Sequence, residues 1–327
     1  MPTQPPARDE KVADAHVRIG ARGSKLSLAQ AGLVQRRIAE ALGADPAEAE
    51  RVAPLVVITT TGDKVQDRRL LEIGGKGLFT KEIEEALLAG RIDCAVHSMK
   101  DVPAVLPDGL CIAAVPERED PRDAFLSSKA ERLEALPQGA RLGTASLRRQ
   151  AQSLHRRPDL EVSLLRGNVD TRLAKLRAGE ADAILLALAG LRRLGLGDLP
   201  QSLIDPTECP PAPGQGALAI ETRAADRDLP WATALRHEPT TVAVAAERGA
   251  LAALEGSCKT PIGAHAWLDG MRLKLIVEAL SPDGRLRFRR AGESDLAEMA
   301  DWEASARALG VSLGEAVRAE GGAAISL

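Results

Sequence analysis

The sequence predicts an α/β fold made of several domains. Two series of short apolar runs, each followed by a helical pattern, fill most of the chain before residue 206, and such alternation predicts largely parallel sheets. Residues 116–122 and 206–213 are dense in proline and charge, which is typical of crossings between domains. The segment after residue 239 has another pattern, one helix followed by alternating strands, and predicts a small α+β domain.

The first series of elements starts near residue 17. It comprises strands at 17–21, 55–58, 92–96 and 110–115 and helices at 28–42 and 78–88. In the first helix Ala31, Val34 and Ile38 recur at helical spacing, and Gly43 closes the helix. Residues 1–16 lack the apolar core of a signal peptide, so we expect a flexible N-terminal tail there.

Two loops of this first series carry cations next to glycine or serine. Arg22 and Ser24 stand at the entrance of the first helix, where free backbone N–H groups favour an anion; a simple capping turn explains them equally well. Residues 74–77 form a Gly-Gly-Lys-Gly loop, but Leu70 and Gly77 occupy positions where a nucleotide-binding loop needs Gly and Ser or Thr. We expect a flexible flap that presents Lys76.

In the stretch 94–103, a predicted buried strand is followed by charged side chains. Lys100 and Asp101 lie on the loop that follows the apolar run 92–96, and Pro103 prevents further regular structure. Ligands of open α/β sheets bind beyond the carboxyl ends of the strands, so this pair is a candidate site. Taken alone, it also fits a solvated Lys-Asp pair on a loop.

The second series is rich in arginine. Its strands at 141–143, 162–165 and 183–187 are each followed by a helix, and a strand at 217–221 is expected to rejoin the first sheet. Between Arg141 and Arg193, ten Arg and one Lys face five Asp or Glu, a local net charge of +6. Because the guanidinium fork suits carboxylates, these residues predict an anion-binding cleft, with an ordinary basic surface as the alternative.

The last segment combines a helix at 240–254, a hairpin of strands 262–268 and 271–279 through Asp269-Gly270, and a strand at 286–289. Cys258 lies on the loop between this helix and the hairpin, next to Lys259. A neighbouring ammonium lowers the pKa of a thiol and makes it more reactive, whereas most lone cysteines are inert small hydrophobes. No Cys-x-x-Cys or His-x-x-x-His pattern exists, so no metal site is expected.

Composition excludes several classes of protein. The net charge is only −3, and aromatic residues make up 2% of the chain with no Tyr, which argues against a nucleic-acid surface built from stacked rings and cations. No apolar run approaches the roughly 18 residues of a membrane span. The four cysteines have neither metal-site nor disulfide-framework spacing, so we expect a reducing cytoplasm.

Seven separate segments carry specific motifs in a fixed order. They are Gly-Gly-Lys-Gly-Leu-Phe at 74–79, His-Ser-Met-Lys-Asp-Val-Pro at 97–103, Glu-Asp-Pro-Arg-Asp-Ala-Phe at 119–125, Gly-Thr-Ala-Ser-Leu-Arg-Arg-Gln at 143–150, Leu-Arg-Gly-Asn at 165–168, Pro-Gly-Gln-Gly-Ala at 213–217 and Glu-Gly-Ser-Cys-Lys-Thr-Pro-Ile-Gly at 255–263. In these motifs the chain closely resembles the porphobilinogen deaminase family over residues 17 to 290.

The resemblance implies a three-domain α/β monomer. Its first two domains would have the type II periplasmic-binding-protein architecture around a cleft, and the third would be small and α+β. The implied domain bounds are 17–116 with 217–238 for the first, 117–216 for the second and 239–327 for the third.

The resemblance also implies an activity, which is the joining of four porphobilinogen molecules into linear hydroxymethylbilane with loss of ammonia. The growing chain is held on a dipyrromethane cofactor, attached by a thioether to the cysteine that matches Cys258. The catalytic aspartate matches Asp101, whose carboxylate would stabilise positive charge at the pyrrole nitrogen and help to remove a proton. The matching substrate- and cofactor-binding positions are Arg22, Ser24, Lys76, Lys100, Thr144, Ser146, Arg148, Arg149, Arg166, Arg172 and Arg193.

The implied partners are porphobilinogen and a transient acceptor of the product, uroporphyrinogen-III synthase; no metal, nucleic acid or membrane is implied. Three positions depart from the family's pattern. Glu72 stands where lysine is common, Ser257 replaces a common glycine, and Asp170 would either weaken local attraction for an anion or pair with Arg172.

Two other functions fit the same fold. A solute-binding or effector-sensing module would share the architecture, but it would have no use for a modified thiol at Cys258. A transferase acting on phosphorylated substrates would be inhibited by phosphate and would hold no chromophore.

Overall fold

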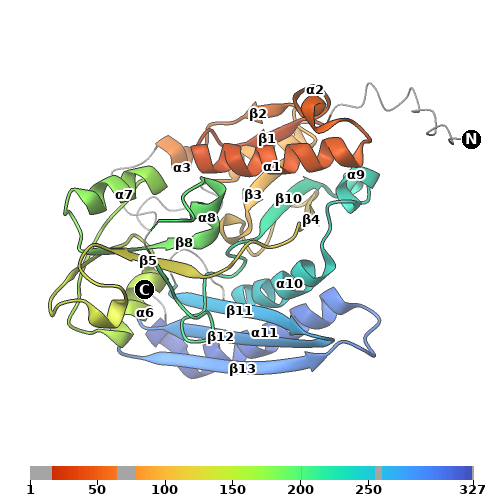
Figure 1. The fold of residues 1–327 in the computed structure, drawn as a ribbon. Coiled ribbons are helices and arrows are strands. Elements are labelled where there is room, and N and C mark those ends of the chain that lie inside the picture. Colours follow the sequence, from red (N-terminus) through yellow and green to blue (C-terminus); the bar gives the residue numbers. More distant parts are fainter. Residues whose placement is uncertain (1–16, 65–78, 200, 255–259, 326–327) are drawn as a thin grey trace, which may run out of the picture.

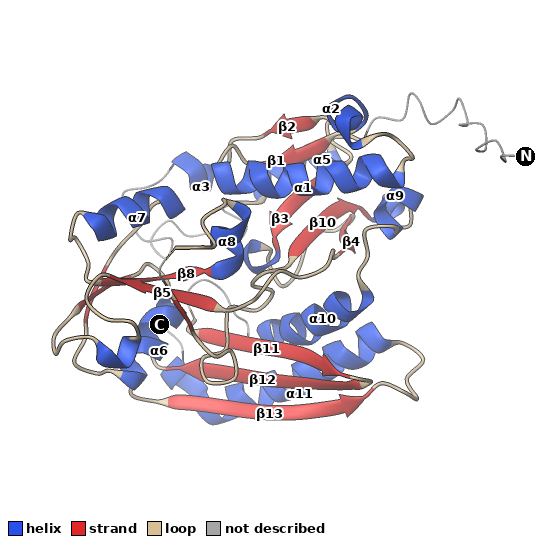
Figure 2. Cartoon of the chain, in the orientation of Figure 1, coloured by secondary structure: helices blue, strands red, loops and turns tan. Residues whose placement is uncertain are grey.

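The computed structural model describes residues 17–64, 79–199, 201–254 and 260–325, and these form three β-sheets with helices packed around them (Figure 1). Two sheets have five strands each and mix parallel with antiparallel pairs, whereas the third has three antiparallel strands. Figure 2 shows the helices distributed around all three sheets. The predicted α/β class, with a small additional α+β unit, is confirmed.

The first sheet is centred on β3, a strand buried along almost its whole length. The strand order is β2-β1-β3-β10-β4, with β1 parallel to β2 and β3, and β10 antiparallel to β3 and β4. Strands covered on both faces need a nearly continuous apolar sequence, which the Cys-Ala-Val start of β3 provides. The strands are β1 (Ile19–Ala21), β2 (Leu55–Val57), β3 (Cys94–Ser98), β4 (Leu110–Ala114) and β10 (Leu218–Arg223).

Helices cover both faces of this sheet. The long helix α1 (Lys25–Ala41) buries Val34 and Ile38 against β1 and β3. The Ser24 side chain caps its N-terminus by accepting a hydrogen bond from Ser27 N. On the other face α5 (Lys81–Leu88) packs Ile83 and Leu87 against Ile92 and Ala95. The shorter helices of this unit are α2 (Ala49–Val52), α3 (Thr61–Lys64) and α9 (Pro230–Thr233).

The second sheet repeats the arrangement of the first. Its order is β7-β6-β8-β5-β9, with β6 parallel to β7 and β8, and β5 antiparallel to β8 and β9. Ser146 and Asn168 cap two of its helices with side-chain hydrogen bonds. The elements are β5 (Asp123–Ser127), β6 (Arg141–Gly143), β7 (Glu161–Ser163), β8 (Ala183–Ala187), β9 (Ser202–Leu203), α6 (Leu147–Arg156), α7 (Val169–Arg177) and α8 (Leu188–Arg193).

Two crossings connect these units, and each delivers an antiparallel strand. The first crossing leads from β4 into β5, which pairs between β8 and β9, and the second leads back into β10, which pairs between β3 and β4. The predicted strand at 217–221 that rejoins the first sheet is therefore confirmed. Two inner strands thus depend on chain segments that pass between the units.

The third unit pairs a three-stranded sheet with two long helices. Its elements are α10 (Glu238–Ala253), β11 (Ile262–Asp269), β12 (Arg272–Leu280), β13 (Arg287–Asp295) and α11 (Trp302–Gly321). Glycines let the helices approach closely: a Cβ added at Gly310 would lie 2.0 Å from the Ala246 carbonyl oxygen, and one at Gly249 would lie 2.4 Å from that of Arg307. In Figure 1 α10 lies between this sheet and the unit that contains β3 and β10.

One buried carboxylate joins both crossings to the third unit. Glu247, on α10, has no exposed surface. It accepts hydrogen bonds from Arg118 Nη1 and Nη2 at 2.8 and 3.0 Å, from Gly214 N at 2.7 Å and from Ala266 N at 2.8 Å. Arg118 belongs to the first crossing, Gly214 to the second and Ala266 to β11, so four segments meet at this carboxylate.

Several elements differ from their predicted bounds. The helix predicted from residue 28 begins at Lys25, because the Ser24 cap precedes it, and β3 runs over Cys94–Ser98 rather than 92–96. The hairpin turn consists of Gly270 and Met271, one residue later than predicted. Strands β5 and β9 and helix α11 were not predicted. The flap expected at residues 74–77 lies outside the described residues.

The close contact between α10 and α11 gives a stability prediction. Gly310→Ala places a methyl group against backbone that cannot move aside without separating the helices, so we expect it to lower the free energy of unfolding by about 1–3 kcal/mol. The measurement is a denaturant titration with a thermal melt.

Gly32→Ala is the matched control, because it makes the same change inside α1, where the nearest atom, Arg36 Nη1, is 3.7 Å from the added Cβ. Since Ala favours helix over Gly by about 0.8–1.0 kcal/mol, this variant should be neutral or stabilised. Equal stability of both variants would contradict the proposed packing limit.

Candidate active site

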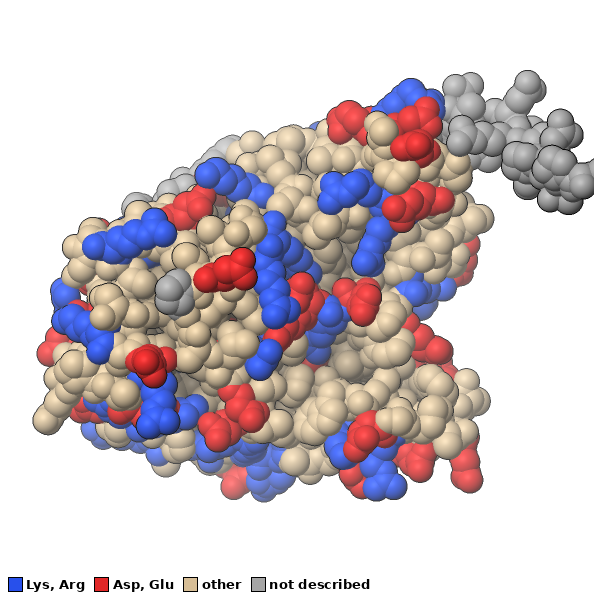
Figure 3. Space-filling model, viewed as in Figure 1, with Lys and Arg blue, Asp and Glu red and all other residues tan. Residues whose placement is uncertain are grey.

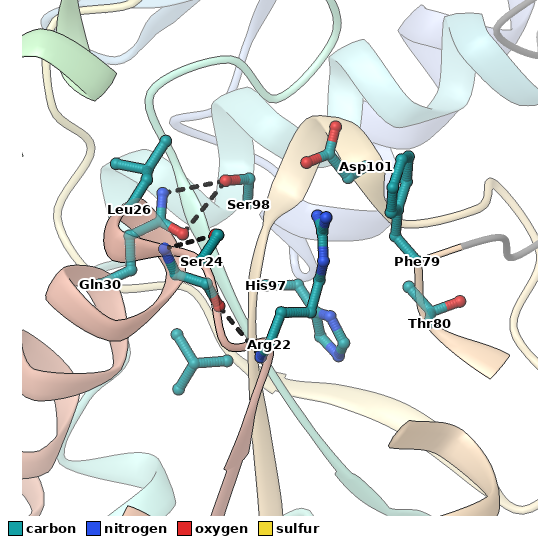
Figure 4. Close-up of a pocket in the computed structure, with 11 residues that line it drawn as sticks. Arg22, Ser24, Leu26, Gln30, Phe79, Thr80, His97, Ser98 and Asp101 are labelled. Carbon is teal, nitrogen blue, oxygen red and sulfur yellow. Dashed lines mark hydrogen bonds between the residues drawn. The ribbon is translucent and has the colours of Figure 1, made fainter. Parts of the chain in front are cut away.

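The end of β3 projects charged side chains beyond the first sheet. The chain leaves β3 at Ser98 and forms one short 3-10 turn, Met99–Asp101, in which Met99 is buried while Lys100 and Asp101 are exposed. Asp101 lines a pocket with residues from the start of α1 and from β3 (Figure 4). The residues lining this pocket are Arg22, Ser24, Leu26, Ser27, Gln30, Phe79, Thr80, Val96, His97, Ser98 and Asp101.

Arg22 enters this pocket from the loop after β1. Its guanidinium stacks 4.2 Å above the Phe79 ring centroid and pairs with Asp63, whose other oxygen accepts hydrogen bonds from the Thr60 N–H and hydroxyl. Burial alone would raise the pKa of Asp63, but the hydrogen bonds from Arg22 and Thr60 outweigh it and lower that pKa. Arg22 is thus held beside Asp101 (Figure 4) with much of its charge already balanced.

The floor of the pocket is fixed by hydrogen bonds. Gln30 Nε2 donates to Ser98 Oγ at 2.9 Å, which ties α1 to the end of β3. Beneath them His97 Nε2 lies 2.9 Å from Glu221 Oε2, and both side chains are almost completely buried. The position of the turn that bears Lys100 and Asp101 is therefore set by α1 and β10 as well as by β3.

In the second unit, Asp123 organises two of the predicted arginines. Arg148 Nη2 donates to one Asp123 oxygen at 2.8 Å, and Arg149 Nη2 and Gln215 Nε2 donate to the other at 2.7 and 2.8 Å. Burial would raise the pKa of Asp123, but Arg148 and Arg149 reverse this effect and lower it strongly. Arg148 also donates to the carbonyl oxygen of Pro210 in the second crossing. It therefore connects α6 to the segment that joins the units.

Arg166 and Arg172 have no carboxylate partner within the described ranges. Arg172 Nε donates to the Gly167 carbonyl oxygen at 2.8 Å, and Arg166 Nη1 is buried without a hydrogen-bond partner, as is Arg149 Nε. Burial, together with Arg149 and Arg166, lowers the pKa of Arg172 to about 10. These three guanidinium groups are therefore close neighbours whose charges are only partly balanced, an arrangement that favours an anion.

Lys100 connects the two sets of residues. Its side chain reaches solvent but is enclosed by protein, and this enclosure lowers its pKa to about 8; Asp101 and Asp123 oppose that shift, while Arg149 and Arg148 add to it. Because charged residues of both units change the pKa of Lys100, this lysine lies where the two units face each other. The turn after β3 therefore faces the arginines of the second unit.

The remaining predicted residues have local structural roles. Ser146 caps α6 and its N–H donates to Thr144 Oγ1 at 3.1 Å, while Arg193 Nη2 donates to the Gly216 carbonyl oxygen at 2.6 Å. Asp170 pairs with Lys25 at 2.9 Å, not with Arg172. This ion pair spans the first and second units. Cys258 and Lys76, with Glu72 and Ser257, lie outside the described residues.

Surface cations differ from those of the site. Near the centre of the face in Figure 3, basic and acidic side chains alternate where α8 meets the first crossing. Arg192 pairs there with Glu119, and Arg122 with Asp120, each at 2.6 Å. These arginines behave like the ordinary basic surface that was the alternative to an anion-binding cleft, because they pair with carboxylates. Arg166 and Arg172 have no such partner among the described residues.

Sequence reasoning missed the partners that hold the site. Asp123 follows the charged first crossing, and its neighbours gave no sign that it would meet Arg148 and Arg149. Glu221 lies in an apolar strand, where a buried carboxylate was itself a signal of a specific partner. Within the described part of the chain, no group of His, Cys, Asp or Glu could hold a metal ion, and no helix is long and apolar enough to cross a membrane.

Comparison with known proteins gives one consistent result. Residues 17–230 match the family model "Porphobilinogen deaminase, dipyromethane cofactor binding domain", and residues 241–319 match "Porphobilinogen deaminase, C-terminal domain". The chain is 77% identical to porphobilinogen deaminase of Phenylobacterium zucineum over the full length of both, and 70% identical to that of a Caulobacter species over 95% of this chain and 98% of the relative.

Among solved structures, substrate-binding domain 2 of Lactococcus lactis GlnP, in its open conformation, is 10% identical to this chain. It matches 68% of this chain and 87% of its own length, with a TM-score of 0.41.

The environment of Lys100 predicts its titration. We expect the amine to lose its proton near pH 8, so that it is positively charged below that pH and neutral above it, where the site attracts anions less. The measurement is an NMR titration of protein with ¹³C-labelled lysine, in which the Lys100 signal is identified by its loss in Lys100→Arg. A midpoint near 10.5, as for ordinary lysines, would contradict the enclosure of this side chain.

Proposed function

The chain belongs to the porphobilinogen deaminase family, and from this membership we propose which of its residues perform the family's reaction. The enzyme joins four porphobilinogen molecules head to tail into hydroxymethylbilane, with release of ammonia, on a covalently bound dipyrromethane. The observation that carries the assignment of residues is the grouping of Asp101 and Lys100 with the incompletely neutralised arginines of the second unit.

The chemistry of these cations fits the cofactor. Each pyrrole bears an acetate and a propionate, and Arg166 Nη1 and Arg149 Nε are buried donors without a hydrogen-bond partner among the described residues. We propose that Lys100, Arg149, Arg166 and Arg172 bind these carboxylates. When bound, the dipyrromethane supplies the pyrrole carbon to which the first substrate is joined. The other proposed contacts are Arg22, Ser24, Lys76, Thr144, Ser146, Arg148 and Arg193.

Asp101 is the proposed catalytic carboxylate. It is exposed at the end of β3, and no described residue donates a hydrogen bond to it, so its oxygens are open to a ligand. When ammonia leaves porphobilinogen, positive charge spreads to the pyrrole nitrogen, and a fixed carboxylate in an enclosed cleft stabilises that charge. The same oxygen can then accept the proton released after carbon–carbon bond formation.

Cys258 is the proposed attachment point. In the sequence it lies between α10, which bears Glu247, and β11. A thioether suits this role because the anchor must survive many turnovers.

Further proposals concern the setting of the enzyme. We propose domain bounds of 17–116 with 217–238, 117–216 and 239–327, a monomer that works in the cytoplasm, and transient transfer of the product to uroporphyrinogen-III synthase. The free thiols of Cys94, Cys111 and Cys209 support a reducing compartment.

Intact-mass spectrometry tests the attachment point. We expect the purified chain to be heavier than its sequence by two pyrrole units, and Cys258→Ser to lose both the added mass and turnover. Cys111→Ser, at a half-buried thiol on β4, is the control and should keep the added mass. A fully active chain without added mass would contradict this proposal.

Asp101→Asn tests the catalytic carboxylate. Because an amide cannot stabilise the cation as a carboxylate does, we expect kcat to fall by about 100-fold or more, while the added mass and the melting temperature stay near those of the unchanged enzyme. Asp108→Asn, at an exposed residue seven positions later, is the control and should retain normal kcat. Near-normal turnover of Asp101→Asn would refute the role.

A further inference from the structure

A buried arginine of the third unit holds the backbone that follows Asp101. Arg248, on α10, is 7% exposed. Its Nη2 donates to the carbonyl oxygens of Pro103 at 2.8 Å and Ala104 at 3.4 Å, and its Nη1 donates to that of Val102 at 3.3 Å. Three consecutive carbonyls after the candidate catalytic carboxylate therefore converge on one guanidinium.

This guanidinium is buried without a carboxylate. Arg148 and Arg149, which are buried to the same extent, both pair with Asp123. In the described part of the chain Arg248 has no such acidic partner, and its hydrogen bonds go to carbonyl oxygens. Burial, with a smaller contribution from Arg307, lowers the pKa of Arg248 to about 10, so the group stays charged at neutral pH. Burying a charge costs free energy, and hydrogen bonds to the three carbonyl oxygens offset part of that cost for Arg248.

Packing fixes the same turn from two more directions. Met99 and Val102 are buried against Val244 of α10 and against the start of β10. Gly214 of the second crossing touches the turn so closely that a Cβ there would lie 2.5 Å from Met99 Cγ. The Gly214 N–H in turn donates to Glu247, the neighbour of Arg248. The turn, the crossing and α10 thus form one packed unit.

The same helix leads to the proposed attachment loop. Arg248 lies five residues before the end of α10 at Ala253, which corresponds to about 8 Å along the helix axis, and Cys258 lies on the loop that follows. The helix that holds the backbone after Asp101 is therefore also the one that precedes the proposed attachment loop in the chain.

We propose that Arg248 is a positioning residue for the reaction, which fixes the turn bearing Lys100 and Asp101 relative to α10. This inference rests on the proposed role of Asp101. Catalysis by a fixed carboxylate needs its geometry held closely, because a misplacement of about 1 Å can cost about 100-fold in rate. Guanidinium suits this task, since its planar fork reaches several acceptors at once, whereas an ammonium is a single point charge.

The test compares Arg248→Met and Arg248→Lys with a matched pair. Arg157 is the control because it also donates to a series of loop carbonyls, those of Leu133, Glu134, Leu136 and Pro137, and no proposed site residue lies on that loop. Arg157→Met and Arg157→Lys therefore report the effect of freeing loop carbonyls far from Asp101. For each variant, kcat, KM, the added mass of the cofactor and the melting temperature are measured.

We expect Arg248→Met to lose about 10- to 100-fold in kcat, with KM and the added mass little changed, and Arg248→Lys to recover part of the loss. Millimolar guanidinium should restore part of the kcat of Arg248→Ala by filling the vacated position. The Arg157 variants should lose stability without losing kcat. A residue that only stabilised the fold would show the Arg157 pattern.

The inference is overturned if Arg248→Met, carrying the cofactor, keeps a kcat within about twofold of the unchanged enzyme, or if its loss matches that of Arg157→Met. If Arg248→Met does not fold, Arg248→Lys decides: a normal kcat there, with no effect of guanidinium on Arg248→Ala, overturns it. If instead the proposed role of Asp101 is wrong, Asp101→Asn keeps its turnover, so the two failures are told apart by the kcat of that variant. The inference alone fails when Asp101→Asn is inactive and the Arg248 variants are normal.

Discussion

The arrangement of the three units depends on the buried carboxylate of Glu247. A fully buried carboxylate is stable only when its oxygens are satisfied, and here the donors come from Arg118, Gly214 and Ala266. These donors belong to the two crossings and to the third sheet. Each unit is therefore held in relation to the others at one point, and α10, which bears Glu247, becomes the reference element of the molecule.

The cations of the cleft divide into two groups with different physical states. Arg148 and Arg149 share Asp123, and Arg22 shares Asp63, so these guanidinium groups are fixed in position and partly neutralised. Arg166 and Arg172 lack such partners among the described residues, and Lys100 has a lowered pKa because protein surrounds it. The acids hold the first group in place, whereas the second group keeps most of its positive charge, which suits the proposed binding of pyrrole carboxylates.

The third unit contacts both of the other units. Its helix α10 contacts the turn after β3 through Val244 and Arg248, while Gln152 of α6 donates to Glu278 of β12 at 3.0 Å. The unit thus contacts residues of both the first and the second unit. The turn that bears Asp101 and the helix α6 of the second unit are therefore both in contact with this third unit.

The sequence alone determined the fold class, the order of the units and the return of the strand at 217–221, because these follow from apolar periodicity and from proline-rich crossings, which are local signals. Its motifs also singled out Asp101, Lys100 and the arginines. Only the tertiary structure decided which charges meet: Asp123 with Arg148 and Arg149, Lys25 with Asp170, Glu247 with Arg118, and Arg248 with carbonyls 146 to 144 positions away. Pairings between residues far apart in the sequence depend on how the sheets and crossings pack. The spacing of residues along the chain does not show which of them will meet.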